Sequence, residues 1–281
     1  MTHVLQRVAQ TRLWHHGPAL LGAVGVSLVL LTLPAEDDIR RAVAAVAILQ
    51  LALVVSWAFA FGFRGHLGSV LIGTGAAIGA DLVAVRAGDP DAPSDPGERL
   101  GPLAAVVALA FVLSFVHQLS RRAPRVDVAG SMSGVALLTA MVIAPSAYVI
   151  LVQLADGPAL LETCVAAIAA AVVVGHVVDL LLPYPRIVEG VPRGLLGFVL
   201  GTGAAMFFAD RTDGADGLVA QLGALILGGV LGGLACLLAI GASYAAVEDR
   251  GPRLAQAAVQ AVLPFAAAAP VAYFVAILVG G

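Results

Sequence analysis

Long apolar stretches separated by short polar ones run through the whole chain. Each is about as long as the 20 residues that an α-helix needs to cross the roughly 30 Å hydrocarbon core of a bilayer. We predict nine spans, at residues 18–33, 42–63, 67–85, 102–120, 131–155, 163–183, 194–210, 218–243 and 254–279. What remains makes only short connections. The pattern therefore predicts an all-α, polytopic transmembrane helical bundle whose function lies within or at the membrane.

Composition excludes two broad classes of protein. Of the 281 residues, 12% are charged and 60% are hydrophobic, whereas soluble domains contain about 25% charged residues. A water-soluble globular protein is therefore excluded. A net charge of −3 leaves no basic excess to neutralise nucleic-acid phosphates. The two cysteines, Cys164 and Cys236, lie inside apolar runs and form neither a disulfide framework nor a zinc site. We expect no metal, no cofactor and no nucleic-acid partner.

Arginine marks the cytoplasmic side of a multipass protein, because the insertion machinery retains positively charged loops there. With the N-terminus inside, ten of the 15 cationic residues, all of them arginine, fall on the inner side of the nine spans. The acidic stretches at 36–38, 89–98 and 213–216 then lie outside. We predict a plasma-membrane protein with a cytoplasmic N-terminus and an extracytoplasmic C-terminus.

The first span follows Arg7, Arg12, His15 and His16, an arrangement similar to the basic start of a signal peptide. Cleavage after position 35 would place Leu33 where a small residue is needed. We therefore favour an uncleaved anchor.

Two segments match in order and spacing. Residues 64–81 and 193–210 each hold an arginine, a Leu-Gly pair, the sequence Gly-Thr-Gly-Ala-Ala and a final aspartate. The pattern Ala-Pro-x-Ala-Tyr at 144–148 returns at 269–273. Spans two to five thus pair with spans six to nine, and an even number of spans gives both halves the same orientation.

This tandem 4+4 parallel repeat predicts three parts. Residues 1–38 form an N-terminal cytoplasmic segment and an extra first helix, residues 39–156 the first four-helix repeat, and residues 157–281 the second. The alternative is that helices rich in alanine and glycine resemble one another through composition alone. The Gly-Thr-Gly-Ala-Ala motif lies in mid-span with no preceding strand and no following lysine, so we read it as close helix packing and not as a phosphate loop.

Asp81 and Asp210 end the two matched helices. A carboxylate inside the hydrocarbon is by default a functional hypothesis, which here would be a pseudosymmetric cation or proton site on the outer side. The alternative is that both are helix-end acids that reach water.

His176 and Asp179 lie three residues apart on one helical face, and we place His117 at a matching depth. Together they could pass a proton, since histidine titrates near neutrality. The alternative is a satisfied packing contact near the membrane interface.

Pro145 and Pro270 occupy matching positions in the two halves, and Pro264 adds a second proline to the last span. Each removes a helix hydrogen bond, and matched helix breaks are typical of transport sites. Tyr148 and Tyr273 follow about one turn later and are binding candidates. Proline kinks are also common as shape devices.

Known membrane enzymes offer no matching motif. Nine spans are similar in number to those of phosphatidate cytidylyltransferases and UbiA-type prenyltransferases, but the first need a lysine that this chain lacks and the second need acidic loops inside. The segment at 210–217 departs from both an EF-hand loop and the CDP-alcohol phosphotransferase pattern.

In general character the chain resembles uncharacterised actinobacterial multipass integral membrane proteins over its full length, through no specific functional motif. The resemblance implies a plasma-membrane location. For function we favour a transporter or a flippase-like carrier of a lipid or small molecule. The alternatives are a non-catalytic scaffold in a cell-envelope or cell-division assembly and a membrane-embedded lipid-modifying enzyme. Besides the lipid bilayer, the partners to consider are other membrane proteins and further copies of the chain.

Overall fold

The computed structural model describes residues 2–32, 38–61, 66–89, 95–121, 128–182, 184–213, 218–248 and 251–280. The helices are α1 (Thr2–Thr32), α2 (Ile39–Ala60), α3 (His66–Val85), η1 (Arg86–Gly88), η2 (Pro96–Leu100), α4 (Gly101–Ser120), α5 (Val128–Ile143), α6 (Ser146–Leu151), α7 (Gly157–Leu181), α8 (Leu195–Asp213), α9 (Leu218–Glu248) and α10 (Arg253–Gly280). The prediction of an all-α bundle is confirmed. The acidic stretches predicted to lie outside fall partly, at 36–37, 90–94 and 214–216, outside the described residues.

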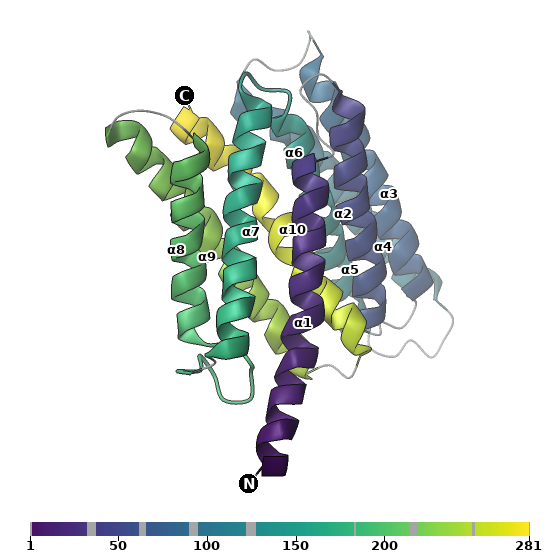
Figure 1. The fold of residues 1–281 in the computed structure, drawn as a ribbon. Coiled ribbons are helices and arrows are strands. Elements are labelled where there is room, and N and C mark those ends of the chain that lie inside the picture. The colour runs from purple at the N-terminus through teal and green to yellow at the C-terminus, as the bar shows by residue number, and fades with distance from the viewer. Residues whose placement is uncertain are drawn as a thin grey trace.

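Eight helical segments in these ranges, not nine, are long and apolar enough to cross a membrane. The predicted span at 194–210 is missing from this set, although α8 covers Leu195–Asp213. Its 19 residues still extend about 28 Å at 1.5 Å per residue. Figure 1 shows α8 running beside α7 and the two termini at opposite ends of the bundle. The chain therefore runs through the bundle along α8, as it does along the other long helices.

The most central helix is α10, which packs against α1, α2, α5, α6, α7 and α9. Figure 1 shows it crossing the bundle between the group α7 to α9 and the group α2 to α6. The largest fully buried side chains include Phe265 and Tyr273 of α10 itself and Tyr148 of α6, whose hydroxyl donates to the Phe265 carbonyl. By contrast α4 lies at the edge, with 17% of its most apolar stretch buried.

Large apolar side chains cover the outside of the bundle. Leu21, Leu71 and Leu278, for example, expose 74%, 74% and 81% of their surface. So much exposed apolar surface is unfavourable in water and favourable against lipid chains. Backbone groups inside the helices are satisfied by the helices themselves, as hydrocarbon requires. The chain is a multipass membrane protein.

Each Gly-Thr-Gly-Ala-Ala motif has one packed glycine and one open glycine. A Cβ on Gly201 would lie 2.7 Å from the Ala171 carbonyl oxygen of α7 and 2.9 Å from Cys236 Sγ of α9. A Cβ on Gly73 would meet Leu138 and Val54 at 3.3 Å. The second glycine of each motif has no neighbour that a Cβ would touch. The motif thus serves helix packing, while the tandem repeat itself stays a prediction.

Gly201→Ala and Gly203→Ala form a matched pair in α8. We expect Gly201→Ala to lower stability by about 1–3 kcal/mol, because backbone atoms of α7 must move to admit the methyl group. Gly203→Ala should be neutral or slightly stabilising, since its Cβ enters open space. Thermal unfolding of both purified variants in detergent checks this, and equal melting temperatures would contradict the packing role.

Candidate functional site

A first buried polar cluster, the Asp81 centre, joins α2, α3 and the start of α6. Gln50 Nε2 donates to Asp81 Oδ1 at 3.1 Å, and Ser146 Oγ donates to the same oxygen at 2.7 Å. The Gln50 amide also donates to the Val142 carbonyl at 2.9 Å. Asp81 exposes 8% of its surface, and Gln50 lies near the middle of α2. Asp81 therefore faces the bundle interior and does not extend outward to water.

The interruption at Pro145 builds this centre. The helix α5 ends at Ile143 and α6 begins at Ser146, and the Ala147 amide donates to the Ala144 carbonyl at 3.0 Å across the break. Proline cannot donate a helix hydrogen bond, so the chain restarts here and the first residue of α6 reaches Asp81. The matching break predicted for the second half is absent, because α10 runs without interruption through Pro264 and Pro270.

The Asp81 centre has no positive charge of its own. Every side chain that hydrogen-bonds to Asp81 in the described ranges is neutral, an amide or a hydroxyl. A carboxylate away from water is strongly unfavourable unless a cation pairs with it or a proton neutralises it. The centre is thus chemically suited to take up one or the other.

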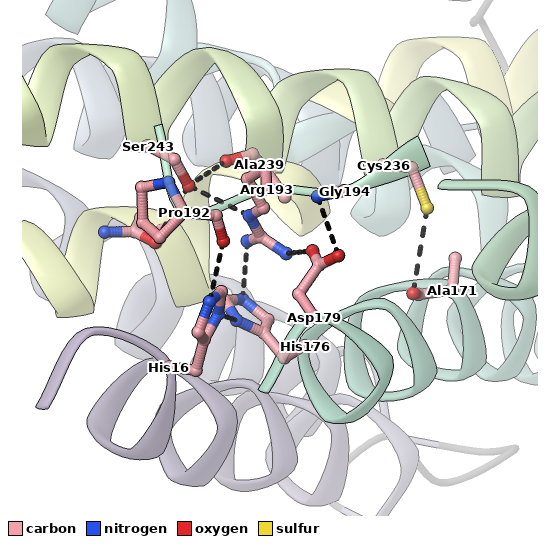
Figure 2. Close-up of polar contacts among 11 residues, drawn as sticks. His16, Ala171, His176, Asp179, Pro192, Arg193, Gly194, Cys236, Ala239 and Ser243 are labelled. Carbon is pink, nitrogen blue, oxygen red and sulfur yellow. Dashed lines mark hydrogen bonds and ion pairs between the residues drawn. The ribbon is translucent and has the colours of Figure 1, made fainter. Parts of the chain in front are cut away.

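A second cluster, the Arg193 centre, lies at the same end of the bundle as the N-terminus of the chain and is shown in Figure 2. Arg193 Nη1 lies 3.1 Å from Asp179 Oδ2, its Nη2 lies 2.9 Å from His176 Nε2, and its Nε donates to Ser243 Oγ at 2.9 Å. His176 and His16 approach through their Nδ1 atoms at 3.1 Å. All five side chains are buried, so the centre ties together α1, α7, α9 and the segment before α8.

The donors and acceptors of the two histidines form one consistent chain. A guanidinium can only donate, so His176 Nε2 accepts and its Nδ1 carries the proton. That proton goes to Nδ1 of His16, which must accept. His16 Nε2 then carries a proton and donates to the Pro192 carbonyl at 2.8 Å. Both rings are therefore neutral, and each of their nitrogens has a partner.

The charges of the Arg193 centre balance. Asp179 Oδ2 pairs with Arg193, and its Oδ1 accepts from the Gly194 amide at 2.9 Å. Burial lowers the pKa of the Arg193 guanidinium, and the adjacent Asp179 carboxylate opposes that shift. Guanidinium starts from so high a pKa that it stays protonated. A Cβ on Gly197 would overlap the Asp179 carboxylate, so glycine is required there.

A folded loop between α7 and α8 points Arg193 inward. The Ile187 amide donates to the Arg193 carbonyl at 3.1 Å, and the Leu195 amide donates to the Pro185 carbonyl at 2.8 Å. Gly190 makes the turn at φ +91°, where side chains are disfavoured. The loop thus returns the chain to the N-terminal end of α8 with its arginine directed into the bundle.

The remaining candidates do not join either centre. Asp210 is half-buried at the end of α8, and within the described residues no hydrogen bond or ion pair reaches it. His117 packs against Gly68 of α3 and takes no part in the hydrogen bonds of the Arg193 centre. Tyr148 donates to the Phe265 carbonyl at 2.9 Å, and Tyr273 is fully buried.

His176 and Asp179 both lie in the Arg193 centre, where each contacts Arg193. The predicted proton relay through these two residues and His117 stays a prediction.

Sequence reasoning missed Gln50, Ser146, His16 and Arg193. An inventory of polar side chains within the apolar runs would have found Gln50. Arg193 and His16 stand at the ends of spans, where the charge pattern places them as loop residues. Only the tertiary fold brings them inside.

Comparisons with protein families, with curated proteins and with solved structures each find no match. In the part of the chain that the structure describes, no three His, Cys, Asp or Glu side chains gather closely enough to hold a metal ion. Function must therefore be inferred from the two centres and from the surfaces around them.

We expect Arg193→Met to destabilise the protein by about 3–5 kcal/mol, because it leaves Asp179 buried without its counter-charge. Adding Asp179→Asn removes that charge and keeps an acceptor for the Gly194 amide, so the double variant should recover part of the loss. Arg211→Met is the control, since Arg211 is exposed on α8 and stacks on Phe207. Thermal unfolding in detergent measures all four variants, including Asp179→Asn alone, and strictly additive losses would contradict the pairing.

Proposed function

We propose that this protein is a membrane carrier for a lipid or other small amphiphilic molecule, with the Asp81 centre as its cation- or proton-binding site. The observation that carries the proposal is the buried Asp81 carboxylate, whose hydrogen-bond partners among the described residues are the neutral side chains of Gln50 and Ser146. Ionisable residues inside a membrane protein typically mark ion pathways and proton relays. Asp210 is half-buried and is assigned no such role.

The surroundings of Asp81 support movement linked to its charge. Its two neutral partners come from α2 and from the short helix α6, which follows the break at Pro145. Neutralising the carboxylate weakens both hydrogen bonds, since bonds to a charged acceptor are about twice as strong as neutral ones. In this proposal α3 then shifts relative to α2 and α6. Uptake and release of the cation or proton thereby bias two arrangements of one helix.

A scaffold is the second candidate, and the Arg193 centre favours it. That centre is charge-balanced, and its two histidines have partners at both ring nitrogens, which describes a clamp between helices better than a site awaiting a ligand. The edge helix α4, with its exposed apolar surface, is the face that a scaffold would offer to a partner.

We expect Asp81→Asn to abolish coupled transport and leave the fold intact, because asparagine keeps an acceptor for Ser146 and Gln50 but cannot ionise. The measurement reconstitutes the protein in vesicles with fluorescently labelled phosphatidylglycerol and follows lipid movement between leaflets under a pH gradient. Wild-type protein should accelerate movement when the gradient is applied, and the variant should lose at least about tenfold of that response.

Asp210→Asn is the matched control, an acid at the end of the corresponding helix, and should transport normally. Unchanged melting temperatures exclude unfolding as the cause of any loss. A wild-type protein that moves no lipid under either gradient direction, or an Asp81→Asn variant as active as wild type, would refute the carrier proposal.

A further inference from the structure

A groove of about 680 Å³ runs between α3 and α4. Its α3 side includes Gly68, Gly75, Gly79 and Arg86, and its α4 side ends at His117. At 100° per residue, these α3 positions lie on the face opposite Asp81. One helix therefore carries the buried acid on one side and the groove on the other.

The dimensions of the groove suit one linear chain. From Gly68 to Arg86 the helix rises about 27 Å, close to the thickness of the hydrocarbon core. Glycine and apolar side chains of both helices line the groove along this length. A hydrocarbon chain that lies along α3 would therefore extend through it from end to end.

Glycine on α3 keeps the groove open. A Cβ on Gly75 would meet no atom within 4 Å, and a Cβ on Gly79 would lie 3.5 Å from Val106 Cγ1 of α4. Side chains at these positions would enter the groove. Leu71, Leu82, Leu109 and Leu113 make its walls apolar.

Polar groups mark only the two ends. Arg86, at the end where Asp81 lies, is exposed, and no carboxylate in the described residues pairs with it. At the other end, the buried Nε2 of His117 has no hydrogen-bond partner among those residues. An apolar channel with an unpaired guanidinium at its mouth complements a molecule with a long chain and an anionic head, because guanidinium binds phosphate through paired hydrogen bonds.

We infer that the α3–α4 groove binds one hydrocarbon chain of an anionic, phosphate-bearing amphiphile, with the phosphate at Arg86 and the chain extending toward His117. Binding follows from the groove itself. The role of this molecule as the transported substrate rests on the proposed carrier function, in which α3 moves when Asp81 changes its charge.

Photo-crosslinking in vesicles tests the inference with two probes, phosphatidylglycerol and phosphatidylcholine that bear the same diazirine-labelled acyl chain. We expect phosphatidylglycerol to label the groove-facing residues of α3 and α4. Gly75→Trp fills the groove and should reduce this labelling at least about fivefold. Arg86→Gln should reduce labelling by phosphatidylglycerol about tenfold and labelling by phosphatidylcholine by less, because choline offsets the charge of that lipid's phosphate.

Gly203→Trp and Arg211→Gln, both on α8, are the matched controls and should label as wild type. Equal labelling by both probes over all lipid-facing helices would overturn the inference. So would a disulfide-linked dimer formed through Gly75→Cys without lipid cross-links, which would assign the groove to a second copy of the chain. Groove labelling without pH-driven lipid movement keeps the binding site and refutes the carrier. Asp81-dependent lipid movement without groove labelling would keep the carrier and refute the binding site.

Discussion

Hydrocarbon offers no hydrogen-bond partners, and this constraint organises the whole structure. Backbone groups are satisfied inside the helices, so the bundle differs from place to place only where a polar side chain turns inward. Two groups of such side chains, around Asp81 and around Arg193, join helices that are distant in the sequence. Elsewhere alanine and glycine let the helices approach closely, as Gly201 does against α7 and α9.

The two buried acids solve the same problem in opposite ways. Asp179 pairs with the Arg193 guanidinium and accepts from the Gly194 amide, and Gly197 leaves room for its carboxylate. Its charge is therefore balanced within the protein. In the described residues, Asp81 accepts hydrogen bonds from an amide and a hydroxyl, and the proposed carrier function assigns its charge balance to a bound cation or proton. A fully paired site favours one arrangement, whereas a partly paired site changes its energy with occupancy. In the proposed function, the Asp81 centre is therefore the one that changes, and the Arg193 centre holds its helices together.

Much of the fold is predictable from the sequence, because apolar length determines helices directly. Most of the spans and the packing role of the small residues follow from the sequence pattern, whereas His176 and Asp179 are joined through Arg193, which their spacing does not reveal. The exception among the predicted spans is α8, which is not among the eight helical segments of the described residues that are long and apolar enough to cross a membrane. The sites were less predictable. Asp81 and Asp210 occupy matching positions in the sequence, which predicted matching surroundings. In the structure Asp81 is buried in the bundle, whereas Asp210 is half-buried. In the sequence Arg193 has the position of a charged loop residue, and it is buried because the loop folds back. Pro270 matches Pro145 in sequence, but α10 continues through Pro270, whereas Pro145 separates α5 from α6.

The contacts of His16 have a consequence for how the protein is made. Its partners, His176 and the Pro192 carbonyl, lie 160 and 176 residues further along the chain. During synthesis α1 therefore enters the membrane long before α7 and the loop that complete its polar contacts. Until then the His16 imidazole lacks the hydrogen bonds that it makes with His176 and Pro192 in the folded protein. Helix α1 is therefore made well before the residues that complete its polar contacts.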